Sequence, residues 1–173
     1  MPPFLIVPIA PSGSGKSTLY TSLEDVNANL HHFSWDLLRL KWYSPDYGIA
    51  WQMYQRDPTF FDRALGEFKK ALVRRDDIYV DNMNLTVESR AQFVTNATVY
   101  GYRKIAYYFN VSFDVLFQRH AHMRAKNKVR LSSYELMQQC NRQSEPRGGE
   151  FDAVIMLDWS GSKGKYEVRQ VVA

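Results

Sequence analysis

The feature that most constrains this chain is a glycine-rich turn that follows a short apolar run. The run, Phe4–Ile9, is bounded by proline and by a turn-forming segment, and so predicts a buried parallel strand that leads into a loop. The loop matches the phosphate-binding pattern with alanine in place of the first glycine. It reads Ala10-Pro11-Ser12-Gly13-Ser14-Gly15-Lys16-Ser17, followed by Thr18. This strand and loop predict a nucleotide-binding α/β domain.

The spacing of the loop has a physical reason. Glycines let the backbone curl so that its N–H groups converge on phosphate oxygens, Lys16 can reach the β- and γ-phosphates, and the Ser17 hydroxyl can ligate Mg²⁺. The alternative, a small-residue turn that contains a lysine by chance, is expected on the order of once in a hundred chains this long. We therefore expect ATP and Mg²⁺ to bind. The predicted nucleotide-binding residues are Ser12, Gly13, Ser14, Gly15, Lys16, Ser17 and Thr18.

Beyond the loop, strand-like and helix-like segments alternate. Helices are expected from about residues 17, 36, 60, 86, 112 and 132, and strands at 28–34, 78–81, 103–109 and 151–157, with a terminal strand or hairpin at 166–172. Thr86 is a predicted helix cap, and Ser132 with Glu135 has the spacing of a capping box. The pattern predicts one domain over residues 1–173, with a mostly parallel central sheet and helices on both faces. The aromatic-rich stretch 42–61 yields no assignment.

Composition narrows the class of protein. Hydrophobic residues make up 45% and charged residues 23%, which excludes disordered, collagen-like and coiled-coil chains. The single cysteine, Cys140, and the absence of a long apolar run favour a cytoplasmic protein with no membrane association. No stable protein partner is predicted. A net charge of +4 suits a phosphate-rich partner.

The residues at the end of the expected strand 78–81 limit what the nucleotide is used for. Motor-type ATPases usually end this strand with Asp-Glu, whereas here Asp81 is followed by Asn82. A guanine-specific switch would carry Asn-Lys-x-Asp, whereas Asn127-Lys128 continues as Val-Arg. Transfer of a phosphoryl group to an acceptor is therefore the favoured class of reaction.

The loop and four later segments, taken in order, resemble the polynucleotide 5′-kinases, especially their bacteriophage and RNA-repair branch. They span about residues 4 to 157, and only the loop is specific by itself. Besides the loop, they are Trp35-Asp36-Leu37-Leu38-Arg39, Asp81-Asn82-Met83-Asn84-Leu85 with Arg90, Phe117-Gln118-Arg119 to Lys128, and Glu145-Pro146 to Phe151-Asp152. The resemblance implies a P-loop kinase fold with a basic lid at about 119–131.

The resemblance also implies roles on the acceptor side. Asp36 would be the general base and Arg39 would grip an acceptor phosphate; the i, i+3 spacing places both on one helix face. An ordinary surface ion pair is the alternative. Asp81 would orient either Mg²⁺-bound water or Asp36. The predicted acceptor-binding residues are Arg39, Asp81, Asn84 and Arg90.

The basic segment 119–130 holds five Lys and Arg residues and no acidic residue. A solvated helix end is one interpretation. The other is a lid whose arginines neutralise charge on the transferring phosphoryl group, with Arg119 and Arg124 as catalytic residues beside Asp36 and Lys16. The family spaces two lid arginines one turn apart, whereas these two are five residues apart, so Lys126 is an alternative partner for Arg119.

Several acceptors fit these residues. The leading one is a 5′-OH end of DNA or RNA; the alternatives are a 5-hydroxymethyluracil base in phage DNA, a nucleoside or small metabolite, and a non-enzymatic, nucleotide-switched nucleic-acid-binding module. An aromatic group is expected either to stack on bases or to form core. It comprises Trp42, Tyr43, Tyr47, Trp51 and Tyr54. His31-His32 and His120-x-His122 do not converge as metal ligands.

Overall fold

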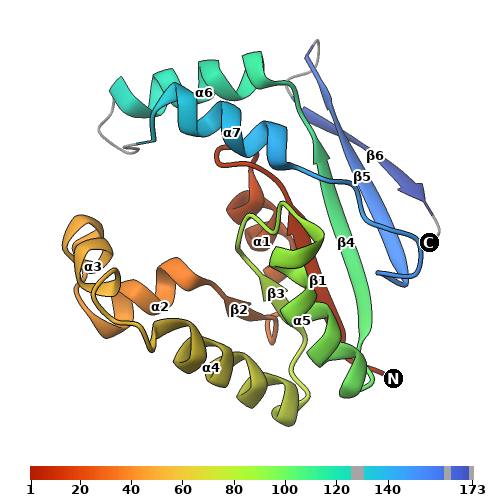
Figure 1. Ribbon diagram of the computed structural model, residues 1–173. Helices are drawn as coiled ribbons and strands as arrows, with labels where there is room; N and C mark the ends of the chain where they lie inside the picture. The colour runs from red at the N-terminus through yellow and green to blue at the C-terminus, as the bar shows by residue number, and fades with distance from the viewer. Residues whose placement is uncertain (126–130, 162–164, 172–173) are drawn as a thin grey trace.

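A six-stranded sheet forms the centre of the molecule (Figure 1), in a computed structural model that describes residues 1–125, 131–161 and 165–171. The strand order is β2-β3-β1-β4-β5-β6, and every neighbouring pair is parallel except β5 and β6. The strands are β1 (Phe4–Ile9), β2 (His31–Phe33), β3 (Ile78–Val80), β4 (Arg103–Asn110), β5 (Ala153–Ser160) and β6 (Lys165–Val171). The predicted, mostly parallel sheet is confirmed.

Seven helices connect and cover the described strands. They are α1 (Lys16–Glu24), α2 (Trp35–Trp42), α3 (Tyr47–Tyr54), α4 (Phe60–Arg74), α5 (Val87–Val99), α6 (Phe113–Ala125) and α7 (Ser133–Arg142). The predicted caps are present, because Thr86 begins α5 and Ser132 with Glu135 forms a reciprocal capping box at α7. The unassigned aromatic stretch contains α3, whose Asp46 cap accepts a hydrogen bond from the Ile49 amide.

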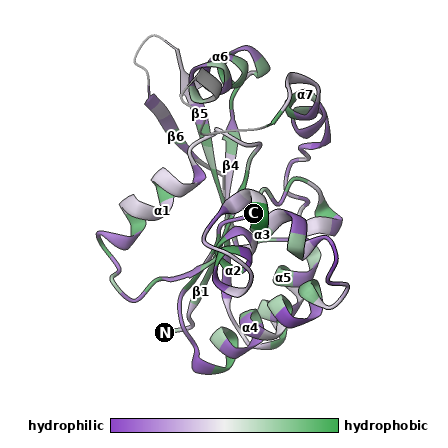
Figure 2. Cartoon of the chain, turned by 90° about the vertical axis from the view of Figure 1, so that its left-hand side faces the viewer, coloured by the Kyte–Doolittle hydropathy of each residue, from purple (hydrophilic) through white to green (hydrophobic). Residues whose placement is uncertain are grey.

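Both faces of the sheet are buried, which explains why β1 is apolar at every position. Leu5, Val7 and Ile9 pack with residues of α4 and α5, whereas Ile6 packs on the other face with residues of α1. Figure 2 shows the sheet nearly edge-on, with α1 on one side and α4 and α5 on the other. Helices therefore cover both faces, as the alternation of segments predicts.

The second strand differs from expectation, whereas the expected C-terminal strand is present. The second strand is shorter than residues 28–34, because residues before His31 form a turn in which the Asn27 side chain bonds to Asp77. The C-terminal segment forms β6, an antiparallel strand that pairs with β5 as a hairpin. Pro8 is tolerated in the central strand because the pairing of β1 with β3 is confined to Leu5 and Ile6.

Helix α7 lies across the carboxyl ends of the central strands. Gln143, the residue at its C-cap, donates hydrogen bonds to the Ile9 and Phe109 carbonyls, and Gln139 accepts one from the Ser12 amide. The phosphate-binding loop is thereby held between β1 and α7. No helix in the described part of the chain is long and apolar enough to cross a membrane.

Candidate nucleotide and acceptor site

The loop after β1 has the backbone geometry that a phosphate cradle needs. Gly13 and Gly15 adopt φ angles of 78° and 104°, which favour glycine. A Cβ atom on Gly13 would lie 3.1 Å from the ring of His120 on α6, so a larger residue would also force that ring to shift. Helix α1 begins directly after the loop without a side-chain cap from the described residues, which leaves its first amides to face an anion.

Lys16 turns back onto this loop. Its Nζ donates to the carbonyl oxygens of Pro11 at 2.9 Å and Ala10 at 3.3 Å. Burial lowers the Lys16 pKa to about 8, while the charges of Asp81 and Asp36 act in the opposite direction. Both carboxylates are therefore within electrostatic reach of the ammonium group, although the sequence separates them from it widely.

A polar cluster at the end of β3 suits a hard cation. The Ser17 hydroxyl donates to Asp81 Oδ2 at 3.1 Å, and His32 Nε2 lies 2.9 Å from the same oxygen. The His32 ring stacks on Tyr20 with 3.8 Å between centroids. A hydroxyl and a carboxylate beside a phosphate cradle are ligands that Mg²⁺ accepts directly or through water, so these residues fit the predicted ion.

His32 is a member of the site that the sequence did not identify. The chain register explains why it belongs there: β2 and β3 are parallel neighbours, with Phe33 opposite Val80, so both strands end at the same edge. No group of three or more His, Cys, Asp or Glu able to hold a metal occurs among the described residues.

Asp36 and Arg39 lie on α2, at the same end of the sheet as the loop. The Ser34 hydroxyl caps the helix, and the Trp35 amide donates to the Asn82 side chain, which fixes the start of α2 against the end of β3. Arg39 Nη1 donates to Asp36 Oδ1, which also contacts the Tyr47 hydroxyl at 3.4 Å. The Asp36 side chain is 54% exposed and remains open to a ligand.

The burial of Arg39 argues against an ordinary surface ion pair with Asp36. It is 8% exposed, and its guanidinium lies over the rings of Tyr54, Trp51 and Phe60 at 4.2, 4.8 and 5.2 Å. Its Nε is buried with no hydrogen-bond partner in the described part of the chain. A buried cation held by aromatic rings and only partly hydrogen-bonded is suited to an anionic ligand.

Two predicted acceptor residues are placed elsewhere. Arg90 is fully buried and ion-paired with Glu150, and its other donors bond to backbone carbonyls of residues 84–85 and 144–145. Asn84, with φ 51°, uses its amide nitrogen to bond three carbonyls, including that of Pro8. At these two positions the motif therefore stabilises the fold, because the side-chain donors of Asn84 and Arg90 already bond to groups of the protein. Neither side chain has a donor free to bind an acceptor substrate.

Arg119, on α6, contacts the phosphate-binding loop directly. Its Nη1 donates to the carbonyls of Gly13 at 3.0 Å and Ser14 at 3.4 Å, and its guanidinium lies 4.0 Å from the Trp159 ring centroid. The Tyr166 hydroxyl donates to the same Ser14 carbonyl at 2.6 Å. Trp159 and Tyr166 were missed because only the β5–β6 hairpin brings them to the loop.

Other parts of the predicted lid cannot be placed. The Arg124 side chain and residues 126–130, which include Lys126, lie outside the described residues. The loop's Ser14 hydroxyl is buried with no partner among the described residues, and so is Nδ1 of His120, which packs on Gly13. The Ser14 hydroxyl belongs to the loop in which phosphates would lie.

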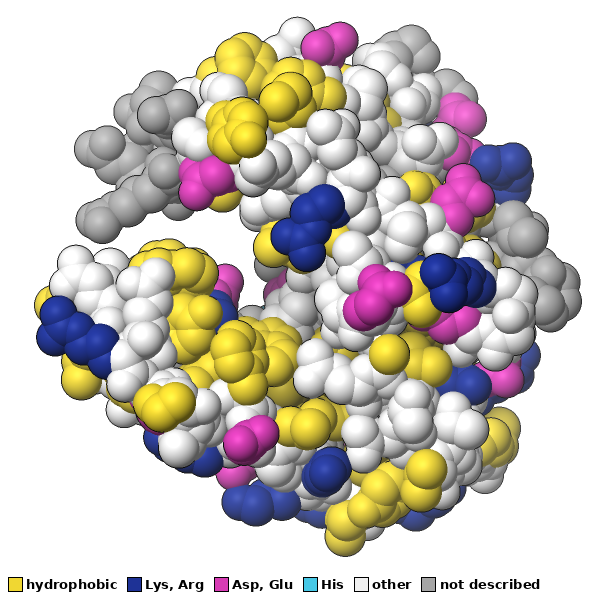
Figure 3. All heavy atoms as spheres, viewed as in Figure 1, with side chains coloured by type: hydrophobic (Ala, Val, Ile, Leu, Met, Phe, Trp, Pro, Cys, Tyr) yellow, Lys and Arg dark blue, Asp and Glu magenta, His cyan; other side chains and the backbone are white. Residues whose placement is uncertain are grey.

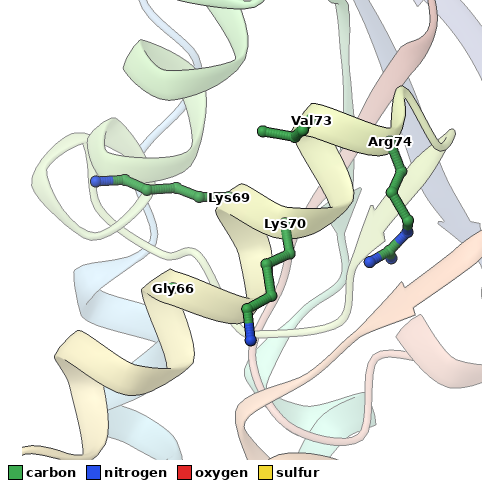
Figure 4. Close-up of a pocket in the computed structure, with 5 residues that line it drawn as sticks. All are labelled: Gly66, Lys69, Lys70, Val73 and Arg74. Carbon is green, nitrogen blue, oxygen red and sulfur yellow. The ribbon is translucent and has the colours of Figure 1, made fainter.

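Helix α4 carries a shallow pocket away from the phosphate-binding loop (Figure 4). Gly66, Lys69, Lys70, Val73 and Arg74 line it. Two of its three cations are neutralised locally, since Lys70 pairs with Glu67 and Arg74 with Asp76. This surface contributes nothing to the site.

Comparison with known proteins agrees with the geometry. Residues 5–146 match the AAA_33 family, which is described as an AAA domain. No curated protein matches the chain. Among solved structures, a gluconokinase from Sinorhizobium meliloti 1021 is similar, with a TM-score of 0.61 and 18% identity over 94% of this chain and 87% of that one.

Two further similar structures concern RNA. A chain of the Pnkp1/Rnl/Hen1 RNA repair complex has a TM-score of 0.66 and 17% identity over 81% of this chain and 43% of that one. A fungal RNA kinase has a TM-score of 0.57 and 18% identity over 91% and 75%. At these identities the likeness concerns the fold, which is that of P-loop kinases.

Proposed function

Because the chain belongs to the AAA_33 family of P-loop kinase-type domains, we propose that it transfers the γ-phosphoryl group of ATP to a hydroxyl of a nucleic acid, most specifically a 5′-OH end. The observation that carries the proposal is the position of Asp36. Its exposed carboxylate lies within electrostatic reach of Lys16 and is hydrogen-bonded to a buried arginine. A hydroxyl placed on Asp36 would lie at the same end of the sheet as the donor loop.

Each side chain then has a stated task. Asp36 accepts the proton of the attacking hydroxyl, and the Arg39 guanidinium holds the phosphate next to it. Lys16 and Arg119 balance negative charge on the phosphoryl oxygens, and Arg124 is proposed as a second lid cation. Ser17, with Asp81, would hold Mg²⁺. When bound, the ion neutralises the β- and γ-phosphate oxygens.

The residue after Asp81 supports transfer over hydrolysis. A hydrolytic site would carry a glutamate there to polarise water, whereas this chain has Asn82, whose side-chain oxygen accepts the Trp35 amide hydrogen. Asn82 therefore positions the helix that carries Asp36 and Arg39. Positioning and electrostatics, rather than activation of water, are the catalytic means available.

An acceptor panel with radiolabelled ATP tests the proposal. The panel contains 5′-OH and 5′-phosphate DNA and RNA oligonucleotides, DNA with internal 5-hydroxymethyluracil, nucleosides and gluconate. We expect label on 5′-OH ends only. Label confined to the modified base, or to a small molecule, would replace the nucleic-acid end by that acceptor, and no transfer to any of them by an ATP-binding protein would refute the proposal.

Salt dependence separates the polymer from small acceptors. A nucleic acid contacted through several phosphates loses affinity steeply as salt rises, whereas a single anionic group on a metabolite loses little. We therefore expect KM for the oligonucleotide, but not for ATP at saturating Mg²⁺, to rise strongly between about 50 and 200 mM salt.

A further inference from the structure

We propose that Tyr47 and Trp51 of α3 form a stacking platform for the terminal nucleobase of the acceptor, an inference that rests on the proposed function. Helix α3 is almost entirely apolar, yet only Ala50 is buried. Tyr47 is 48% exposed and Trp51 38%, and their rings lie nearly parallel, at 23° with centroids 6.1 Å apart. Exposed, aligned aromatic surface of this kind indicates a binding partner.

The platform borders an aromatic core and is more exposed than it. Trp42, Tyr43 and Tyr54 pack around the buried Phe60, with centroids 5.7, 6.2 and 5.0 Å from it. Among the described residues, Tyr47 and Trp51 make no ring contact with Phe60. Trp51 meets the core group at Tyr54, with 5.2 Å between ring centroids, and both Tyr47 and Trp51 stay more than a third exposed. The aromatic stretch therefore divides into a part that supports α2 and α3 and a part that remains available.

Two contacts join the platform to the acceptor pair. The Tyr47 hydroxyl lies 3.4 Å from Asp36 Oδ1, and the Arg39 guanidinium lies 4.8 Å from the Trp51 ring centroid. Figure 3 shows the hollow beside α3, with hydrophobic side chains gathered along the α3 side. A ligand there meets a carboxylate, a cation and a flat aromatic surface within one small area.

A nucleotide at a 5′-OH end carries the three matching groups: a hydroxyl, a phosphate and a flat base. A sugar acid carries the first and an anion but has no ring to cover Tyr47 and Trp51. Base–aromatic stacking contributes regardless of which base is present, so the platform would recognise an unpaired end without reading its sequence. The inferred substrate class is a single-stranded end.

The test compares two 5′-OH oligonucleotides that differ only in whether the terminal nucleotide has a base or is abasic. In the wild-type protein we expect kcat/KM to be about 5- to 150-fold higher for the acceptor with the base. Trp51→Ala should reduce this ratio to near one, and Trp51→Phe should keep most of it. Met53→Ala, on the same helix, is the matched control and should keep the wild-type ratio.

The ratio separates stacking from a disturbance of Arg39, because a displaced Arg39 lowers transfer to both acceptors equally. A wild-type ratio of one, or an undiminished ratio in Trp51→Ala, would overturn the platform while leaving the kinase proposal standing. If the wild type phosphorylates neither acceptor, the kinase proposal fails, and fluorescence anisotropy of the same oligonucleotides still tests the platform. If the wild-type protein is a dimer that Trp51→Ala dissociates, and if its kcat/KM ratio for the two acceptors is one, then α3 serves self-association instead.

Discussion

The Ser17 hydroxyl donates a hydrogen bond to Asp81 Oδ2 across 3.1 Å, although 64 residues separate them in the chain. This bond joins the first turn of α1 to the end of β3. Asp81 is further held by His32, whose Nε2 lies 2.9 Å from the same oxygen. The candidate cation site is therefore assembled from three sequence segments that meet at one edge of the sheet.

Replacing His32 tests the support of this site. His32→Phe keeps an aromatic ring to stack on Tyr20 but removes the contact with Asp81. Partners of this kind typically change metal affinity 10- to 100-fold, so we expect the Mg²⁺ concentration for half-maximal transfer to rise by roughly tenfold or more. The KM for acceptor at saturating Mg²⁺ should not change. An unaltered Mg²⁺ requirement would show that His32 does not position Asp81.

The lowered pKa of Lys16 predicts a pH-dependent affinity for ATP. In the nucleotide-free protein Lys16 is protonated below pH 8 and loses its proton above it. Bound phosphates favour the charged form, so binding above about pH 8 must take up a proton, and affinity must fall as pH rises there. Below pH 7 this group should have no effect. Calorimetry at pH 7 and 9, in buffers of different ionisation enthalpy, measures the uptake.

Lys16→Arg supplies the matched control, because a guanidinium stays charged over this range. That variant should bind ATP without proton uptake at pH 9, whatever its affinity. Equal proton uptake in the variant and the wild type would assign the linked proton to another group.

Asp36→Asn tests the general base. The amide keeps the size of the side chain and its contacts with Arg39 and Tyr47 but cannot accept the proton. We expect transfer to fall by about 10²- to 10⁴-fold with ATP binding unchanged. Asp46→Asn, at the exposed cap of α3, is the control and should retain near-normal transfer. Normal turnover in Asp36→Asn would remove Asp36 from the mechanism.

Arg119 is predicted to act by charge and by shape. Arg119→Ala should lower kcat by about 10²- to 10³-fold, as removal of a stabilising donor does in other active sites. Arg119→Lys should recover only part of the loss, because an ammonium cannot reproduce the planar contact with Trp159. Arg103→Ala, at the exposed start of β4, provides the comparison. Full activity in Arg119→Ala would leave this residue a purely structural contact of the loop.

Arg90 is expected to matter for stability and not for acceptor binding. Arg90→Met leaves Glu150, whose side chain is only 9% exposed, without its partner. Breaking a buried pair in this way costs about 3–5 kcal/mol, measured as the free energy of unfolding in urea. The double variant with Glu150→Gln should lose less than the two single losses added together. A selective rise in acceptor KM at normal stability would return Arg90 to the acceptor site.

Much of the fold follows from local pattern. Thr86 and the Ser132–Glu135 box begin helices where the sequence predicts them, and β1, β3, β4 and α4 occur where apolar spacing places them. These features depend on neighbouring residues in the chain, so a sequence reports them directly. The short β2 was overestimated because a turn with its own side-chain bonds competes with the strand there.

The site residues that are close in the chain were predicted better than those that only packing brings together. The loop residues are contiguous, and the Asp36–Arg39 pair lies within one helical turn, so spacing alone brings each group together. Asn84 and Arg90 share their motif with Asp81, and a sequence cannot tell which member points at a ligand and which at carbonyl groups inside the protein. Burial decided that, and burial depends on how α5 packs against residues 144–150.

By itself the sequence determined the class of chemistry: an apolar strand, two glycines able to adopt positive φ, and a lysine and serine at the start of a helix specify a phosphate cradle. The tertiary structure decided what surrounds that cradle. His32 reaches Asp81 through strand pairing, Tyr166 reaches Ser14 through a hairpin, and Tyr47 and Trp51 stay exposed because Phe60 fills the core beneath α3. Each of these contacts joins residues that are distant in the chain. Packing of the strands and helices, and not local spacing, decides which of them come into contact.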